Sequence, residues 1–440
     1  MVRRHITGGL NGARLFSCVL MAFLLASGGA QAAEPAKLDG SATAWVITAS
    51  ALVLFMTLPG LALFYGGLVR ARNLLSVLMH CFVIACLVSI LWMAFGYSLA
   101  FDPGTPLIGS LGALGLAGIR GHVSASGLPE GVVALFQMTF AVITPALIIG
   151  AFVERVRFSF VVWFSAIWLV LVYLPVAHWV WGGGWLAALG TLDFAGGIVV
   201  HTTAGVSALV AAILIGPRDG FPTHLEPPHS PGMTMAGAGM LWVGWFGFNG
   251  GSALAADASA AGAILATHFA AAAAGLAWIA LERIRLGKPT SVGIVTGCVA
   301  GLATITPASG YVGPSAAAVL GATGGIVCFF AVNWVKGRLR IDDSLDVFAV
   351  HGVGGMLGSL LVAVFALPIL GGAGYGHDAA FATQLGTQAL GVAAVALWSI
   401  ICTIAVVKLL AATTGLRVSV EEQREGLDLT THGERAYDLV

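Results

Sequence analysis

Long apolar stretches recur along this chain and are separated by short segments that hold most of its charged residues. Beyond residue 32, each stretch is close to the ~20 residues that a helix needs to cross a membrane. We count eleven such stretches, at 44–66, 74–101, 130–152, 158–178, 196–216, 231–253, 258–284, 290–306, 315–335, 345–367 and 384–414. The pattern predicts an all-α polytopic membrane protein with eleven transmembrane helices.

The first apolar stretch differs from the others. Three arginines within residues 1–14 precede a short apolar run at 15–26, and residues 30–32 read Ala-Gln-Ala. This order is typical of a cleavable signal peptide. We therefore predict that residues 1–32 are removed and that the new amino terminus lies outside; an uncleaved first helix is the alternative.

Charge is distributed unevenly over the connections. With an outside start, 15 of the 17 Lys and Arg residues after the signal peptide fall on the inner side, and only Lys37 and Arg120 fall outside. This bias follows the positive-inside rule. A cytoplasmic tail at 415–440 and a location in the cell (inner or plasma) membrane are predicted.

Composition supports the membrane assignment and narrows the chemistry. Hydrophobic residues make up 58% of the 440 positions and charged residues 9%, which excludes a soluble globular domain. The 20 basic and 20 acidic residues balance, so no nucleic-acid partner is expected. The six cysteines show no metal-ligand spacing, and neither a metal nor a cofactor is predicted.

An internal repeat is visible. The motif Asp-x7-His-x3-Gly begins at Asp193 and again at Asp343, and Phe-x-Gly-Gly occurs at 64–67 and 248–251. These matches fall on predicted helices five and ten, and on helices one and six. Because five is an odd number, two five-helix halves must have opposite orientations.

The halves at about 44–216 and 231–367 therefore form an inverted five-helix repeat, and the helix at 384–414 is one extra. Transporters of this plan hold their site near the midplane of the membrane.

The repeated motif places His201 and His351 inside apolar helices, where ionisable side chains are costly and usually functional. Eight residues of helix from Asp193 and Asp343 put each histidine ~12 Å from its own face. In a core of ~30 Å this leaves an axial separation of ~6 Å. The two rings are predicted to meet as a buried proton-handling pair.

The same helix directions order the aromatic residues by depth. Phe136 lies one turn outside Phe140 on helix three, and Ser252 lies one turn outside Phe248 on helix six. Phe136 should therefore share a layer with Ser252, and Phe140 with Phe248.

Several segments resemble the Amt/Mep/Rh family of ammonium transporters, and in particular its bacterial Amt branch. The resemblance lies in 193–218, Trp-Phe-Gly-Phe-Asn at 245–249, Asp-Val-Phe-Ala-Val-His-Gly at 346–352 and Glu-Glu-Gln-Arg-Glu-Gly-Leu-Asp at 421–428. It covers essentially the whole mature chain. It implies that 33–414 is an ammonium transporter membrane domain and that the protein is not an enzyme.

The resemblance implies an outer recruitment site for ammonium at Phe136, Trp181 and Ser252. Aromatic faces attract a cation with ~0.5 to 2 kcal/mol, and a serine oxygen accepts a hydrogen bond from it. For Trp181 alone, a membrane-interface anchor is the alternative.

The resemblance also implies a gate at Phe140 and Phe248, although either residue taken alone is typical of packing. Asp193 and Trp245 are implied as supporting residues. For Asp193, support of the outer mouth and capping of a helix amino terminus are equally favoured.

The tail and the assembly follow from the resemblance as well. It implies a homotrimer and a cytoplasmic tail that is linked to blockade by a PII-class nitrogen-signalling protein. A solvated charged tail is the ordinary alternative.

A bare cation is costly to move through an apolar pore, whereas ammonia is neutral. We therefore expect ammonium to bind at the mouth, lose a proton and pass as ammonia along His201 and His351. These rings are predicted to be neutral and linked by one ring hydrogen bond. Passive ammonia flux and net ammonium transport both stay open.

Two other functions stay open: an ammonium sensor (transceptor) that signals through the tail, and an Rh-like channel for another small neutral molecule. An intramembrane enzyme is disfavoured because the histidines have no nucleophile at catalytic spacing. Six further histidines are expected to be interface, packing or loop residues: His80, His178, His224, His229, His268 and His377.

Overall fold

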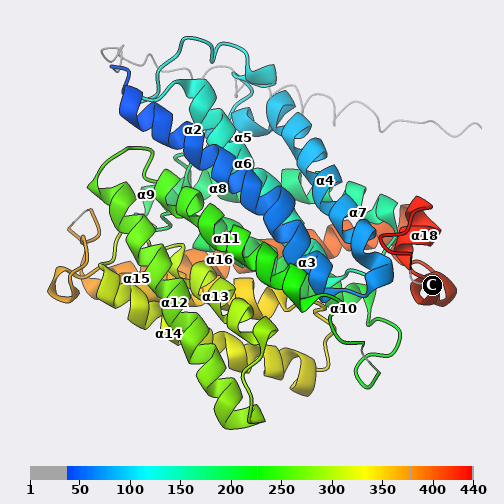
Figure 1. Ribbon diagram of the computed structural model, residues 1–440. Coiled ribbons are helices and arrows are strands. Elements are labelled where there is room, and N and C mark those ends of the chain that lie inside the picture. The colour runs from blue at the N-terminus through cyan, green and yellow to red at the C-terminus, as the bar shows by residue number, and fades with distance from the viewer. Residues whose placement is uncertain (1–36, 225, 377, 439–440) are drawn as a thin grey trace, which may run out of the picture. The chain divides into compact units, whose positions relative to one another are not determined.

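The computed structural model describes residues 37–438, apart from 225 and 377 (Figure 1). The predicted signal peptide, 1–32, and His377 lie outside the described residues. Every regular element within them is a helix, and the only β pairing there consists of two isolated bridges. The all-α prediction is confirmed.

Nine helical segments of the described chain are long and apolar enough to cross a membrane. The first predicted half contains α2 (Gly40–Phe55), α3 (Ala62–Leu68), α4 (Leu74–Leu91), α5 (Tyr97–Phe101), α6 (Glu130–Ile148), α7 (Phe158–Trp168), α8 (Leu174–Val180), α9 (Trp185–Ala188) and α10 (Thr203–Ile215). The second contains α11 (Pro231–Gly251), α12 (Ala258–Leu286), α13 (Ser291–Ile305), α14 (Pro314–Asn333) and α15 (Val353–Phe365). They are followed by α16 (Phe381–Thr413), α17 (Val420–Glu425) and α18 (Leu427–His432).

Helices α11 and α13 fill the predicted ranges 231–253 and 290–306 but are not among these nine, and α13 has only 15 residues. The polytopic helical plan is thus supported, while the count of eleven stays a prediction.

Several of the long segments contain a widened π-helical turn, a feature often found at functional sites. These turns are η1 (Met56–Leu61), η3 (Trp92–Gly96), η6 (Leu169–Tyr173), η7 (Gly197–Thr202), η8 (Trp334–Arg338) and η9 (Phe348–Gly352). Short 3-10 turns are η2 (Ala71–Asn73), η4 (Leu114–Leu116), η5 (Ile149–Ala151) and η10 (Pro368–Leu370). The two histidines of the repeated motif both lie in π-helical turns, His201 in η7 and His351 in η9.

Helix α11 lies along α2 and α3 (Figure 1). Small residues permit this close approach: a Cβ at Gly237, Gly244 or Gly247 would overlap atoms of the facing helix. The indole of Trp45 also donates a hydrogen bond to the Gly250 carbonyl at 3.1 Å. The first helical segment of each predicted half is therefore packed against its counterpart.

The histidine-bearing segments cross in the same way. A Cβ at Gly205 would overlap the backbone of Gly352, and a Cβ at Gly355 would lie 2.5 Å from the Cβ of His201. Only residues without a side chain allow helices to approach this closely. The crossing brings η7 and η9 side by side and thereby brings the two histidines together.

We expect Gly205→Ala to destabilise the fold. The added methyl overpacks the crossing, which typically costs about 1–3 kcal/mol. Thermal unfolding of the purified protein should show a lower midpoint. Gly239→Ala in α11 is the control, because a Cβ there meets open space. Equal midpoints for wild type and Gly205→Ala would contradict the tight crossing.

Candidate functional site

An aspartate caps each histidine segment. The Asp193 carboxylate accepts the backbone N–H groups of residues 196–199 at 2.6–3.0 Å. The Asp343 carboxylate accepts those of Val347 and Phe348 at 3.0 and 2.8 Å. Each carboxylate therefore satisfies the donors that a helix start leaves unpaired. The capping role that the sequence offered for Asp193 is present in the geometry.

Asp193 also contacts Trp181, a residue of the predicted recruitment site, through its main chain. Its carbonyl oxygen accepts a hydrogen bond from the Trp181 indole at 2.9 Å. Burial raises the pKa of the Asp193 carboxyl to about 6, against the opposing effect of the four backbone N–H groups. The four N–H donors favour the ionised carboxylate, whose two oxygens can accept all of them.

The two histidine rings meet, as predicted. His201 and His351 are buried, and their rings are stacked with centroids 5.3 Å apart and planes inclined by 18°. The predicted hydrogen bond between them is wrong. Within the described residues, neither ring nitrogen of His201 has a hydrogen-bond partner, and Nδ1 of His351 has none. The two near-parallel rings therefore lie close together without a hydrogen bond between them.

Trp245 packs on the histidine pair. Its ring is stacked 5.6 Å from His201 with an interplanar angle of 21°. The indole N–H donates to the Thr306 hydroxyl at 2.9 Å, which fixes the ring orientation. The structure therefore places Trp245 as a wall beside His201, consistent with a supporting residue.

The phenylalanine pair, Phe140 and Phe248, lies directly beside the histidines. Their ring centroids are 4.3 Å apart and both side chains are buried. The Phe248 ring is 6.1 Å from His201. The structure thus brings together the two residues that were predicted to share a layer.

A cavity of about 530 Å³ is lined by Phe140 and by residues of the predicted outer recruitment site, and we call it the outer cavity after that prediction. Trp181, Ser252 and Phe140 line it, and the Phe140 and Trp181 rings meet edge to face at 5.5 Å. The Ser252 hydroxyl donates to the Phe248 carbonyl at 2.8 Å, so its oxygen can still accept. Phe136 does not line the cavity; its ring packs against Phe140 at 5.0 Å.

Gln137 and Phe194 also line the outer cavity, and neither was predicted as a site residue. The amide oxygen of Gln137 is buried and has no hydrogen-bond partner among the described residues. A polar residue within an apolar helix, one turn before Phe140, was the available signal for Gln137. Phe194 directly follows Asp193, but nothing in the sequence indicated that its ring reaches this cavity.

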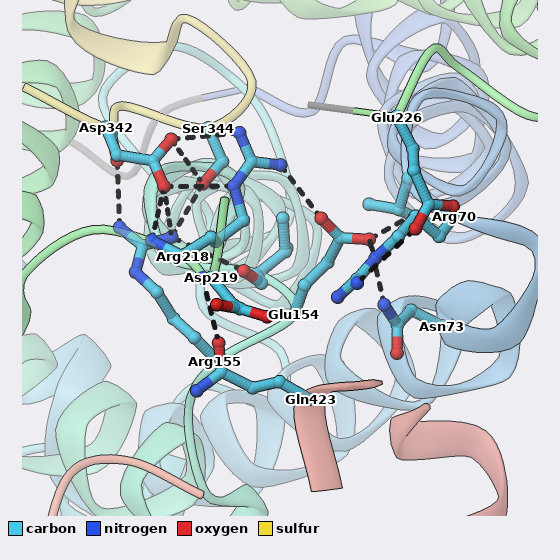
Figure 2. Close-up of polar contacts among 12 residues, drawn as sticks. Arg70, Asn73, Glu154, Arg155, Arg218, Asp219, Glu226, Asp342, Ser344 and Gln423 are labelled. Atoms are coloured by element: carbon cyan, nitrogen blue, oxygen red, sulfur yellow. Dashed lines mark hydrogen bonds and ion pairs between the residues drawn. The ribbon is translucent and has the colours of Figure 1, made fainter. Parts of the chain in front are cut away.

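A polar cluster lies at the helix ends that are distant from the outer cavity (Figure 2). Glu154 adopts a positive φ of 70°, which is uncommon for a residue other than glycine. Its carboxylate accepts from Arg70, Asn73 and Arg218 at 2.8–2.9 Å. Burial alone would raise the pKa of Glu154, but Arg218 and Arg70 outweigh it and hold the pKa at about 2.

Asp342 completes this cluster. Arg218 binds both oxygens of its carboxylate, at 2.9 and 3.0 Å, and Arg155 approaches to 3.8 Å (Figure 2). Burial opposes ionisation, yet these arginines keep the pKa of Asp342 below its ordinary value. Because Glu154 and Asp342 both bind Arg218, the cluster ties together connections from both predicted halves. The sequence showed these residues only as loop charges.

The carboxyl-terminal tail docks on the same end. The Asp428 carboxylate accepts the backbone N–H groups of Leu75 and Ser76 at 3.1 and 2.8 Å and so caps α4. The Leu427 N–H donates to the Asn73 side chain at 2.8 Å. In Figure 1 the red tail helix α18 lies beside α4 and α7. The tail is therefore packed on the helices and is not freely solvated.

No cluster of three His, Cys, Asp or Glu side chains in the described ranges could hold a metal ion. The candidate site residues instead form a row of groups: the outer cavity comes first, then the phenylalanine pair, then the histidine pair. An aromatic and imidazole row of this kind can select and orient a small molecule.

Comparisons with known proteins agree with this arrangement. Residues 44–437 match the model of the Ammonium Transporter Family. The chain is 48% identical to an ammonium transporter of Aquifex aeolicus, covering 92% of this chain and 96% of that protein. It is 46% identical to an ammonium transporter of Bacillus subtilis, covering 88% and 96%.

Solved structures are similar over the same extent. Candida albicans Mep2 superimposes with a TM-score of 0.81 at 36% identity and 88% coverage of both chains. A structure titled Sensor Amt Protein gives a TM-score of 0.83 at 31% identity, covering 89% of this chain and 98% of that one.

The helical fold and its buried row of groups define a polytopic membrane transport protein and not an enzyme. The chain belongs to the ammonium transporter family, and its relatives include bacterial ammonium transporters.

We expect Asp193→Asn to lower stability. An asparagine keeps one acceptor oxygen and turns an NH2 group toward N–H donors, and an unsatisfied buried donor costs about 1–3 kcal/mol. The thermal unfolding midpoint should fall clearly. The control is Asp257→Asn, an exposed cap of α12 in which one oxygen accepts from Ser259 and Ala260. A fall of equal size in the control would contradict a special role for the buried cap.

Proposed function

We propose that this protein transports ammonium by binding the cation in the outer cavity, removing a proton there and conducting ammonia past the phenylalanine pair to the histidine pair. The observation that carries the proposal is the order of these groups. Trp181 lies 5.5 Å from Phe140, Phe140 lies 4.3 Å from Phe248, and Phe248 lies 6.1 Å from His201 by ring centroids.

Recruitment of a cation is supported by the chemistry of the outer cavity. The rings of Trp181 and Phe140 offer negative faces, worth about 0.5 to 2 kcal/mol toward a cation. The Ser252 oxygen and the unpartnered Gln137 amide oxygen offer acceptors for N–H groups. A channel for a neutral molecule has no need of such a site, which disfavours the Rh-like alternative.

Loss of the proton is supported by the phenylalanine pair. Phe140 and Phe248 are 1% and 0% exposed, so a molecule between them loses its hydration. Desolvation is costly for ammonium, sodium and potassium alike and small for ammonia. Only the neutral form then passes, once the rings have moved apart.

The histidine pair is the next partner for ammonia. The ring nitrogens of His201 and Nδ1 of His351 have no protein partner in the described chain, so they are available to a guest. A neutral imidazole offers one N–H donor and one acceptor. Because no hydrogen bond links the two rings, we propose that a proton passing between them is carried by a molecule that bonds to both.

We further propose the topology that charge predicts: eleven membrane helices as an inverted five-helix repeat plus one, with the mature amino terminus outside and 415–440 in the cytoplasm. The crossing of η7–α10 with η9–α15 supports the repeat, because an aspartate that caps the segment and closely packed glycines recur on both segments. The inner or plasma membrane is the proposed location.

A homotrimer and blockade by a PII-class nitrogen-signalling protein complete the proposal. The docked tail supports regulation, because a structured surface on the proposed cytoplasmic side can bind a protein. A sensor role is the second candidate, since a similar solved structure is titled Sensor Amt Protein.

We expect His201→Ala and His351→Ala each to reduce uptake of labelled methylammonium at least tenfold, because ammonia loses its polar partners behind the phenylalanine pair. His268→Ala is the control, since this ring lies on the exposed face of α12. Currents from liposomes under an ammonium gradient then decide whether a proton crosses the membrane together with ammonia, because only that transport carries net charge. Wild-type uptake and intact potassium exclusion in both variants would overturn the pore assignment.

We expect Asp428→Ala to release the tail from α4, because two backbone N–H groups lose their acceptor. Limited trypsin digestion should then cut the tail faster, and binding of a PII-class protein should weaken. Glu425→Ala, an exposed change in the same tail, serves as the control. Equal cleavage rates in both variants would contradict docking through Asp428.

A further inference from the structure

One buried histidine outside the pore has a hydrogen-bond geometry that a neutral ring cannot satisfy. His178 lies in the last turn of α8 and is 2% exposed. Its Nδ1 lies 3.0 Å from the Ala100 carbonyl oxygen, and its Nε2 lies 2.8 Å from the Thr105 carbonyl oxygen. Both distances are those of good N–H···O bonds.

A carbonyl oxygen only accepts hydrogen bonds, whereas a neutral imidazole has one N–H group and one lone pair. In either neutral tautomer, one ring lone pair would face a carbonyl lone pair at 3.0 Å or less. We propose that His178 is a doubly protonated imidazolium that clamps the loop 102–108 to the end of α8 and so positions Trp181. The clamp is a structural inference, and its effect on transport rests on the function proposed for Trp181.

The loop is arranged as a row of acceptors. Three consecutive carbonyls face the α8–α9 segment: Thr105 bonds to His178, Pro106 accepts the Trp185 N–H at 3.0 Å, and Leu107 accepts the Trp179 indole at 2.8 Å. A backbone N–H and an indole can only donate. The Thr105 carbonyl, like the other two, therefore requires a donor, and the group that faces it is Nε2 of His178.

The surroundings favour a positive charge on the ring. Ala100 lies in the last turn of α5 and His178 in the last turn of α8, so the ring lies at two helix carboxyl termini, where free carbonyls make the field negative. No described side chain forms an ion pair with His178. The adjoining cavity of about 440 Å³ has no other charged residue in its lining.

Asp102 is the charged residue on the clamped loop. Its carboxylate is bound by the Ser98 hydroxyl at 2.6 Å and the Ala113 N–H at 2.7 Å, and it is not paired with the histidine. The two carbonyls are therefore the groups that hold the proposed charge in place.

The clamp lies next to Trp181. The N–H groups of Trp181 and Gly182 donate to the Ala177 carbonyl at 2.8 and 3.0 Å, and Gly184 donates to the His178 carbonyl at 2.9 Å. A Cβ at Gly182 would overlap the Ala100 carbonyl. Trp181 is therefore held between this turn and the Asp193 carbonyl. Loss of the clamp should affect substrate affinity more than the turnover rate.

The charge on the ring can be read directly in full-length protein in lipid vesicles. Ala177–His178 is the only Ala-His pair in the sequence, so 13C-carbonyl alanine combined with uniformly 13C,15N-labelled histidine selects His178 through its peptide bond in solid-state NMR, and transfer along its carbons reads the ring nitrogens without a mutation. We expect both ring nitrogens to be protonated at neutral pH. A neutral tautomer would overturn the clamp, whatever the transport mechanism is.

The positioning role is tested by methylammonium uptake at neutral pH. His178→Ala, which removes both N–H donors, should raise the apparent KM severalfold with a smaller change in kcat. His178→Lys, which keeps a charged donor, should restore much of the wild-type KM. The His268→Ala control should follow wild type. A wild-type KM in His178→Ala, or equal KM values in His178→Lys and His178→Ala, would overturn positioning by charge.

Discussion

The close crossing of the two histidine-bearing segments is the constraint on which the site depends. Gly205 meets the backbone of Gly352, and Gly355 meets the Cβ of His201, so neither position has room for a side chain. Without a strong hydrophobic driving force between helices in lipid, such packing is a main source of helix association. It places the two imidazoles close together, with ring centroids 5.3 Å apart.

Buried polar groups fix the geometry around this crossing. The Asp193 carboxylate holds the start of η7 through four N–H groups, while its carbonyl holds the Trp181 indole. At the other end, Glu154 and Asp342 share Arg218 and join connections that are distant in sequence. In a low-dielectric interior, such fully paired groups specify one arrangement because each unpaired alternative is costly. The outer cavity and the row of rings are thereby positioned by buried polar contacts.

Some site residues followed from periodicity, and others did not. The meeting of Phe140 with Phe248 was predictable because helix direction and a fixed rise per residue determine depth. Depth does not determine which way a side chain turns around the helix axis relative to its neighbours. The resemblance implied Phe136 as a recruitment residue, but its ring packs on Phe140 and does not line the cavity, whereas the neighbouring Gln137, which was overlooked, does. The placement of the two histidine rings likewise depends on how the helices cross, and the expected hydrogen bond between them is absent.

The sequence by itself determined the membrane class, the helical ranges, the repeated Asp-x7-His-x3-Gly motif and the family resemblance. These features rest on local composition and on spacing along one chain, which need no knowledge of neighbouring helices. Only the tertiary structure decided the outer cavity, the salt-bridge cluster around Arg218, the docking of Asp428 and the two carbonyls that face His178. Each of these depends on groups far apart in sequence that packing brings within hydrogen-bond distance, so no local pattern could indicate them.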